Sequence, residues 1–173
     1  MKTPQVLNLL RIVPDFPKPG VVFRDISPLL ASPADFSAVI NQMEKEVSEL
    51  HFDTIVAIES RGFVFGAPLA VKLKTPLVMA RKPGKLPGAT ESARYGLEYG
   101  TDALHIQRES LAPGSSVLVV DDVLATGGTA KAAGQLIEQL GAKVAGYLFL
   151  LELNALGGRA ELANAPVKAV AAA

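Results

Sequence analysis

The chain contains no cysteine, which excludes disulfide bonds, thiolate metal sites and a cysteine nucleophile. It also has no excess of charge, because 17 basic residues balance 17 acidic ones. No overall field therefore favours nucleic acid or an anionic membrane, and any phosphate affinity must come from a local group of residues. The sequence has no apolar run of about 18 residues and no signal-peptide pattern, so we expect a cytoplasmic protein.

The 173 residues are 49% apolar and 20% charged, which suits a single domain over residues 1–173. Short apolar runs that are typical of buried strands alternate with helical patterns, and these strands are predicted at Thr54–Ile58, Pro76–Ala80, Ser116–Val120 and Lys143–Leu151. Helices are expected after a Ser32 cap, from Phe63 to Leu73 and from Ala130 to Leu140. This order predicts an α/β fold, a mostly parallel sheet flanked by helices on both faces, with ligands at the carboxyl ends of the strands.

Two regions lack these patterns. A short helix is expected near residues 6–12, and prolines at 14, 17, 19 and 28 should keep residues 13–28 extended or turned. From Arg81 to Gly100 the sequence has glycines, prolines and no steady period, which predicts a long loop. Loops of that length inside a compact domain are often functional lids.

The segment VLVVDDVLATGGTA, Val117 to Ala130, joins a buried strand, two carboxylates, a loop of small residues and the start of a helix. Small residues let backbone N–H groups approach a ligand closely, and the helix directs its positive end to the same place, so a phosphate is the expected ligand. The segment is not a Walker loop, because no lysine follows the second glycine. Aspartates beside a phosphate-binding loop favour a sugar phosphate.

This segment resembles the signature of type I phosphoribosyltransferases, which bind phosphoribosyl pyrophosphate (PRPP). Four further segments resemble the adenine phosphoribosyltransferases in order and spacing, namely PDFPKPGVVFRDISPLL (Pro14–Leu30), ESRGFVFG (Glu59–Gly66), RKPGKLPG (Arg81–Gly88) and LEYG (Leu97–Gly100). The resemblance implies the type I fold, with a small N-terminal hood over residues 1–30 and a mobile active-site loop over residues 82–100. Gly157-Gly158-Arg159 resembles a family loop near the base, although the residues themselves indicate only a turn.

The resemblance also implies roles for individual residues. The 5′-phosphate and ribose of PRPP would be bound by Asp121, Asp122, Ala125, Thr126, Gly127, Gly128 and Thr129. Pyrophosphate would be bound by Glu59, Ser60, Arg61, Arg81, Lys82 and Lys85. Adenine would be bound by Val22, Phe23, Arg24, Glu98 and Tyr99. The residues expected to act in catalysis are Arg61, Glu98, Asp121 and Asp122.

The implied reaction is adenine plus PRPP giving AMP and pyrophosphate, which is purine salvage. Mg²⁺ is the implied cofactor, held mainly by PRPP without dedicated protein ligands. The implied partners are the two substrates and a second copy of the chain in a homodimer, with no nucleic acid and no membrane. Two alternatives stay open: transfer to hypoxanthine, guanine or xanthine, or a PRPP-sensing regulator on the same fold.

Overall fold

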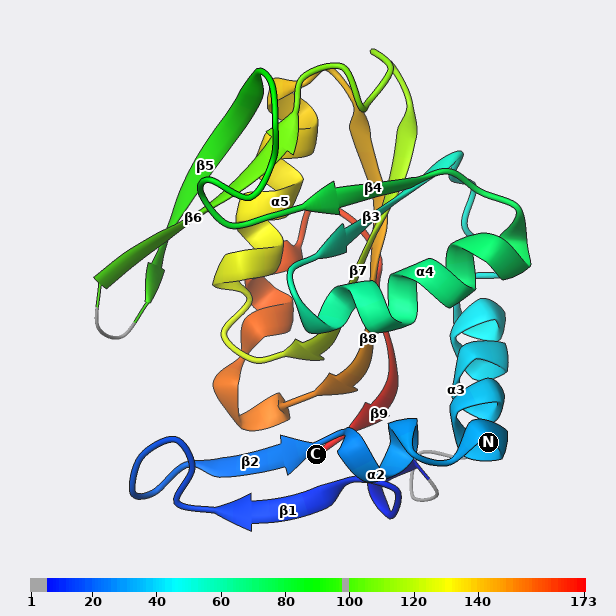
Figure 1. Cartoon of the computed structure of the whole chain (residues 1–173), viewed down its shortest axis with the longest axis vertical. Helices are drawn as coiled ribbons and strands as arrows, with labels where there is room; N and C mark the ends of the chain where they lie inside the picture. The colour runs from blue at the N-terminus through cyan, green and yellow to red at the C-terminus, as the bar shows by residue number, and fades with distance from the viewer. Residues whose placement is uncertain (1–5, 98–99) are drawn as a thin grey trace.

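The computed structural model, which describes residues 6–97 and 100–173, is built around a five-stranded sheet (Figure 1). The strand order is β4-β3-β7-β8-β9, and all neighbours are parallel. These strands are β3 (Thr54–Ile58), β4 (Leu77–Ala80), β7 (Ser116–Leu124), β8 (Lys143–Glu152) and β9 (Val167–Ala172). The predicted α/β class with a parallel sheet is confirmed.

Helices cover both faces of this sheet. Helices α3 (Pro33–Glu46) and α4 (Arg61–Leu73) lie on one face, and α5 (Gly128–Gln139) lies on the other. Side chains along β7 alternate between the two cores: Leu118 packs with the α3 and α4 residues, whereas Val119 packs with those of α5. A strand that is buried on both faces reads as an unbroken apolar run, which is why β7 is clear in the sequence.

Helix α3 begins where the sequence predicts. The Ser32 hydroxyl accepts a hydrogen bond from the Asp35 N–H at 3.4 Å, and Pro33 occupies the first turn. Val39, Ile40 and Met43 are buried, as the helical spacing of apolar residues indicated. The cap satisfies an N–H group that has no partner inside the helix.

The N-terminal segment, for which the resemblance implies a hood, differs in one respect from its predicted secondary structure. Strands β1 (Arg11–Pro14) and β2 (Val22–Asp25) pair as an antiparallel ribbon, followed by the short helix α2 (Ser27–Leu30). Within the described residues, the helix expected near residues 6–12 covers only Val6 and Leu7, because Arg11 and Ile12 pair with β2 instead. The ribbon lies beyond the carboxyl ends of the central strands (Figure 1).

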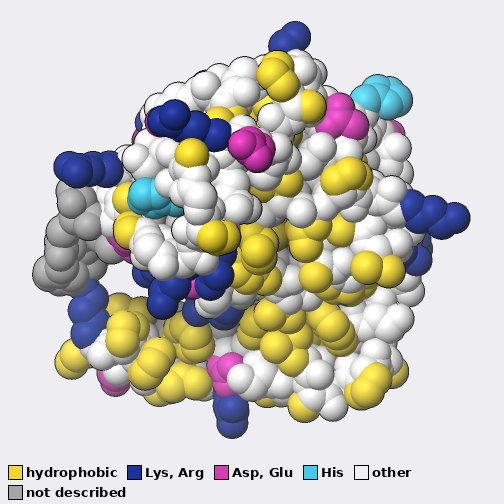
Figure 2. All heavy atoms as spheres, turned by 45° about the horizontal axis from the view of Figure 1, so that its top comes forward, with side chains coloured by type: hydrophobic (Ala, Val, Ile, Leu, Met, Phe, Trp, Pro, Cys, Tyr) yellow, Lys and Arg dark blue, Asp and Glu magenta, His cyan; other side chains and the backbone are white. Residues whose placement is uncertain are grey.

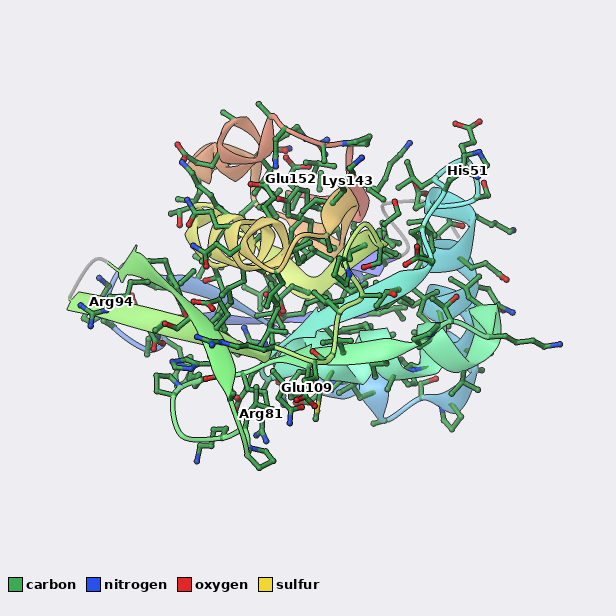
Figure 3. The ribbon with its side chains drawn as sticks, turned by 90° about the horizontal axis from the view of Figure 1, so that it is seen from above. His51, Arg81, Arg94, Glu109, Lys143 and Glu152 are labelled. Carbon is green, nitrogen blue, oxygen red and sulfur yellow. The ribbon has the colours of Figure 1, made fainter. Side chains whose placement is uncertain are left out.

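Residues 81–100 are not one long loop, and that prediction is wrong for their second half. Strand β5 (Thr90–Leu97) pairs antiparallel with β6 (Gly100–Gln107). Among residues 90–96, the part of β5 whose burial is described, only Ala93 is buried, whereas β6 contributes Leu104 and Ile106 to the core beside α5. A strand with so few apolar side chains lacks the alternation of apolar and polar residues that predicts a strand, so the sequence did not indicate β5. The ribbon extends away from the sheet, with Arg94 on its outer part (Figure 3).

Two short 3₁₀ helices, η1 (Asn154–Leu156) and η2 (Gly158–Leu162), connect β8 to β9. Strand β7 continues through both aspartates to Leu124, four residues beyond the predicted end at Val120. Within residues 6–97 and 100–173, no helix is long and apolar enough to cross a membrane.

Helix α5 approaches β8 closely at Gly134. A Cβ atom at this position would lie 2.3 Å from the hydroxyl oxygen of Tyr147, which is buried as the sequence predicted. Tyr147 has little freedom to move, because its ring is 1% exposed. Packing therefore requires glycine inside this helix, although glycine lowers helix stability elsewhere.

We expect Gly134→Ala to destabilise the fold by about 1–3 kcal/mol, the usual cost of overpacking a core. At an open helix position the same change stabilises by about 0.5–1 kcal/mol, so the sign of the effect tests the contact. In a Tyr147→Phe background the penalty should largely disappear, since the hydroxyl is gone. Urea denaturation of the four proteins measures this coupling, and an equal penalty in both backgrounds would contradict it.

Candidate active site

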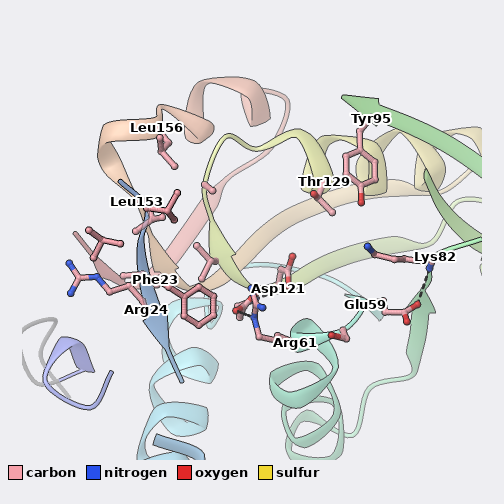
Figure 4. A pocket seen from close by; sticks show the side chains of 17 residues that line it. Phe23, Arg24, Glu59, Arg61, Lys82, Tyr95, Asp121, Thr129, Leu153 and Leu156 are labelled. Atoms are coloured by element: carbon pink, nitrogen blue, oxygen red, sulfur yellow. Dashed lines mark hydrogen bonds and ion pairs between the residues drawn. The ribbon is translucent and has the colours of Figure 1, made fainter. Parts of the chain in front are cut away.

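A cleft of about 560 Å³ opens at the carboxyl ends of β3, β7 and β8, beneath the hood (Figure 4). This is where ligands bind in open parallel sheets, and the volume suits a small molecule. The walls of the cleft come from the hood, from the ends of β3 and β7 and the segments that follow them, from β8 and the turn after it, and from the β5–β6 ribbon. The lining residues are 21–24, 59–61, Lys82, Tyr95, 121–123, Ala125, Thr129, Leu151, Leu153 and Leu156.

The predicted phosphate-binding residues gather in one place. A smaller hollow of about 70 Å³ adjoins the cleft and is lined by residues 123–130 together with Asp121. Gly127, at the N-cap of α5, has a φ of 85°, a left-handed conformation that glycine adopts without strain. The hollow therefore lies at the positive end of α5, next to free backbone N–H groups, which is the geometry of an anion site.

The paired aspartates lie between this hollow and the rest of the cleft. Because side chains alternate along β7, Asp121 faces the hollow, whereas Asp122 faces Arg61 at the start of α4. Asp122 is 4% exposed and forms an ion pair with the Arg61 guanidinium, while its N–H donates to Asp121 Oδ1 at 2.8 Å. Burial and the adjacent Asp122 carboxylate hold the pKa of Asp121 well above its ordinary value. A cation beside Asp121 would favour its ionised form.

Arg61 connects these acids to the hood. Its guanidinium carbon lies 5.7 Å from the centre of the Phe23 ring, and Phe23 makes an edge contact with Phe16 at 5.1 Å between ring centres. The start of α4, which carries Arg61, lies close to β7 because residue 62 is glycine. A Cβ atom on Gly62 would lie 2.7 Å from the Val120 carbonyl oxygen. Arg61 is half exposed, so its remaining N–H groups face the cleft, where they can bind an anion.

Glu59 is held by the residues that follow β4. Its carboxylate accepts hydrogen bonds from Arg81 Nε at 3.2 Å, Arg81 Nη2 at 3.3 Å and the Lys82 N–H at 2.9 Å. Burial alone would raise the pKa of Glu59, but these hydrogen bonds outweigh it and lower the pKa. The peptide bond from Glu59 to Ser60 is cis.

The three predicted basic residues after β4 occupy different places. Lys82 lines the cleft, whereas Arg81 and Lys85 do not. Arg81 is occupied by Glu59, donates from Nη1 to the Lys85 carbonyl oxygen at 3.0 Å, and lies over the Phe63 ring. Arg81 therefore contacts Glu59 and does not itself line the cleft.

Tyr95, on β5, lines the cleft, and Asp102, on β6, contacts both Tyr95 and the cleft residue Lys82, although the sequence did not single out either ribbon residue. The Asp102 carboxylate pairs with Lys82 Nζ at 2.9 Å and accepts from the Tyr95 hydroxyl at 3.2 Å. The hydrogen bond to Asp102 raises the pKa of Lys82, and burial raises the pKa of Tyr95. Tyr95 was missed because β5 was predicted as a loop. Glu98 and Tyr99, which were expected at the base, lie outside the described residues.

One side of the cleft has an apolar wall that sequence reasoning also missed. Leu151, Leu153 and Leu156 line the same cleft as the predicted hood residues Val22, Phe23 and Arg24, and Leu153 and Leu156 lie near Phe23 (Figure 4). Leu151 lies near the carboxyl end of β8 and Leu153 just beyond it, so the parallel register of the sheet could have indicated both. The result is a slot with an aromatic ring and leucine side chains, suited to a flat heterocycle.

Comparison with known proteins identifies the family. Residues 26–163 match the phosphoribosyl transferase domain. An adenine phosphoribosyltransferase of Synechococcus sp. (strain CC9605) is 54% identical over 162 residues, covering 93% of this chain and 94% of the relative. The crystal structure of the adenine phosphoribosyltransferase of Thermoanaerobacter pseudethanolicus has a TM-score of 0.97 at 43% identity, covering 99% of this chain and 100% of that one.

A Saccharomyces cerevisiae adenine phosphoribosyltransferase, solved with adenine and an imino-altritol bisphosphate, has a TM-score of 0.89 at 43% identity. That match covers 95% of this chain and 96% of the yeast chain. Sequence, fold and the arrangement of the cleft thus lead to one conclusion. The chain belongs to the adenine phosphoribosyltransferases, within the phosphoribosyl transferase domain family.

Proposed function

We propose that the cleft transfers the 5-phosphoribosyl group of PRPP to adenine, giving AMP and pyrophosphate. The observation that carries this proposal is the joining, in one cleft, of an anion hollow, a carboxylate pair and an aromatic slot. AMP presents the same three groups in the same order: a phosphate, a ribose with two hydroxyls and a flat base. The yeast relative, solved with adenine, supports the choice of base.

The phosphate and ribose would bind along the β7–α5 connection. Backbone N–H groups of residues 125–129 and the hydroxyls of Thr126 and Thr129 would hold the 5′-phosphate in the smaller hollow. Asp121 and Asp122 would accept hydrogen bonds from the ribose hydroxyls. Carboxylates at this position would also stabilise positive charge on the ribose ring.

Pyrophosphate would bind opposite, where Ser60, Arg61 and Lys82 line the cleft. Arg61 and Lys82 are held by Asp122 and Asp102, so their charges are in place before the substrate arrives. Arg81 and Lys85 would act at longer range by raising the local positive potential, with Arg81 keeping Glu59 in position. Direct contact of Arg81 or Lys85 with pyrophosphate stays a prediction from the sequence.

Adenine would occupy the slot between Phe23 and the leucine wall, with main-chain groups of Val22 and Arg24 reading its edge. Roles for Glu98 and Tyr99 at the base stay predictions. Breaking of the bond from C1 of the ribose to pyrophosphate would run ahead of bond formation to adenine, leaving cationic character on the ring. The protein then contributes position and fixed charge without a covalent intermediate. Closure by the β5–β6 ribbon and the segment before it would keep water from the cation.

Mg²⁺ is the proposed cofactor, and the donors present fit it. The ion would be held mainly by PRPP, and the carboxylates of Asp121 and Asp122, which line the cleft, would lie beside it without serving as dedicated ligands. Bound there, the ion would neutralise charge on the leaving pyrophosphate. Its ligands would come from oxygens of PRPP and from water.

A homodimer is also part of the proposal. Hydrophobic side chains spread over one face of the molecule beside a group of lysine and arginine side chains (Figure 2). Val71 of α4 is 80% exposed, and Leu77 and Met79 are exposed on β4, the edge strand of the sheet. An edge strand with exposed apolar side chains is a surface that proteins usually cover.

A cytoplasmic location stays a prediction from the sequence.

A substrate panel tests the reaction. With PRPP and Mg²⁺, we expect AMP and pyrophosphate from adenine, and no nucleotide from hypoxanthine, guanine or xanthine. A chelator should abolish the reaction, and excess Mg²⁺ should restore it. Product from an oxopurine would retain the PRPP site but contradict the base assignment. PRPP binding without turnover on any base would favour the sensor alternative.

Asp122→Asn should lower kcat by about 100-fold or more, because it removes a charge aimed at the ribose. The substitution keeps the shape of the side chain, so the thermal midpoint should fall only moderately. Glu91→Gln is the matched control, since Glu91 pairs with Arg108 on the ribbon and does not line the cleft. Steady-state kinetics compares the two, and a kcat for Asp122→Asn equal to the control would rule out its role.

Phe23→Ala should raise the KM for adenine by about 10- to 100-fold, because stacking of a base on an aromatic ring contributes about 1–3 kcal/mol. The KM for PRPP should change much less. Phe16→Ala is the comparison, since Phe16 touches Phe23 without lining the cleft. If both variants raise the adenine KM equally, Phe23 acts through hood packing and not by stacking.

A further inference from the structure

The turn between β8 and β9 (residues 153–162) lies between the two halves of the cleft. It begins at Leu153 and includes Leu156, both on the apolar wall (Figure 4), and at Gly158 it packs against the β7–α5 connection. The sequence indicated only a turn at Gly157-Gly158-Arg159. In the folded chain this segment touches both the base side and the phosphate side.

Contact with the phosphate side is made by backbone against backbone. A Cβ atom on Gly158 would lie 2.2 Å from the Ala125 carbonyl oxygen and 2.8 Å from the Gly127 nitrogen. In the reverse direction, a Cβ atom on Gly127 would lie 2.6 Å from the Gly158 carbonyl oxygen. No side chain fits between the two segments, so Gly158 supports the phosphate-binding loop directly from below.

Arg159 anchors this support to the sheet. Its guanidinium pairs with both carboxylate oxygens of Glu152, at 2.9 Å from Nε to Oε1 and through a short contact from Nη2 to Oε2. The Nη1 group donates to the Val167 carbonyl oxygen at 2.6 Å, so Arg159 ties the turn to both β8 and β9. Glu152 is 7% exposed, and a buried carboxylate with a bidentate partner is held in one geometry.

A second ion pair links the turn to α5. Lys131 Nζ lies 2.7 Å from Glu161 Oε2, but both side chains are about half exposed, so water screens this pair. The anchor at Arg159 is therefore the stronger constraint on Gly158.

We propose that Gly158 and Arg159 are positioning residues for the 5′-phosphate of PRPP and AMP. Contact with Gly158 fixes the position of the backbone N–H groups in residues 125–129 relative to the cleft. The ion pair between Arg159 and Glu152 holds Gly158 in place. Because the same turn carries Leu153 and Leu156, it also sets the separation between the phosphate and the base. This inference rests on the proposed phosphate role of residues 125–129.

Two neighbouring glycines provide a matched pair of variants. Gly157 has a φ of 66° and no atom within 4 Å of an added Cβ, so alanine there strains the turn without touching the phosphate-binding loop. Alanine at Gly158, where φ is not left-handed, displaces that loop instead. Comparing the two separates general strain in the turn from a specific effect on the phosphate.

Calorimetric titration of the full chain with AMP, ribose 5-phosphate and adenine measures the effect. For Gly158→Ala we expect the Kd of both phosphorylated ligands to rise by about tenfold or more, a loss that corresponds to at least one poorly placed charge-assisted contact. The Kd for adenine should change by less than about twofold. Gly157→Ala should bind all three ligands like the wild type, even with a lower thermal midpoint.

Arg159→Lys gives a second test if Gly158→Ala does not fold, because lysine keeps the charge and loses the bidentate geometry. It should weaken AMP and ribose 5-phosphate and leave adenine unchanged. Wild-type affinities in Gly158→Ala, or an equal loss for adenine and the phosphorylated ligands, would overturn the positioning role. Wild-type protein that binds adenine but no phosphorylated ligand would instead overturn the phosphate assignment of residues 125–129.

Discussion

The ion pair between Asp122 and Arg61 joins β7, the central strand of the sheet, to the start of α4. Strand β7 is buried on both faces, and it brings two adjacent carboxylates to the carboxyl edge, where burial and mutual repulsion disfavour two negative charges. Arg61 offsets one of them and also contacts the Phe23 ring of the hood. A chain without net charge thus obtains a strongly polar site by concentrating opposite charges in one place.

Close backbone contacts determine the spacing of that site. Gly62 brings the start of α4 against Val120, and Gly158 brings the β8–β9 turn against Ala125. A side chain at a contact can change rotamer, whereas two backbones in direct contact cannot adjust in this way. These glycines therefore fix the distances between the segments that form the walls of the cleft. Side chains connect the hood and the β5–β6 ribbon to the rest of the site: Phe23 of the hood contacts Arg61, and Asp102 of the ribbon pairs with Lys82.

Sequence reasoning succeeded where the signal is local. The buried strands, the Ser32 cap and the connection from Asp121 to Thr129 each carry their own pattern. It failed at β5, where Ala93 is the one buried side chain within residues 90–96 and the partner strand supplies the apolar surface. The pattern of basic residues also did not show that Arg81 engages Glu59 whereas Lys82 lines the cleft.

The sequence by itself determined the α/β class, the small-residue connection from β7 to α5 and the acid pair, because each depends on residues that are neighbours along the chain. Only the tertiary structure decided which lysine faces the cleft, which leucines line it together with Phe23, and what packs against the β7–α5 connection. Those contacts join segments such as Ala125 and Gly158 that are far apart in sequence. Their distances depend on strand register and on how closely two backbones pack, and neither is encoded in a short motif.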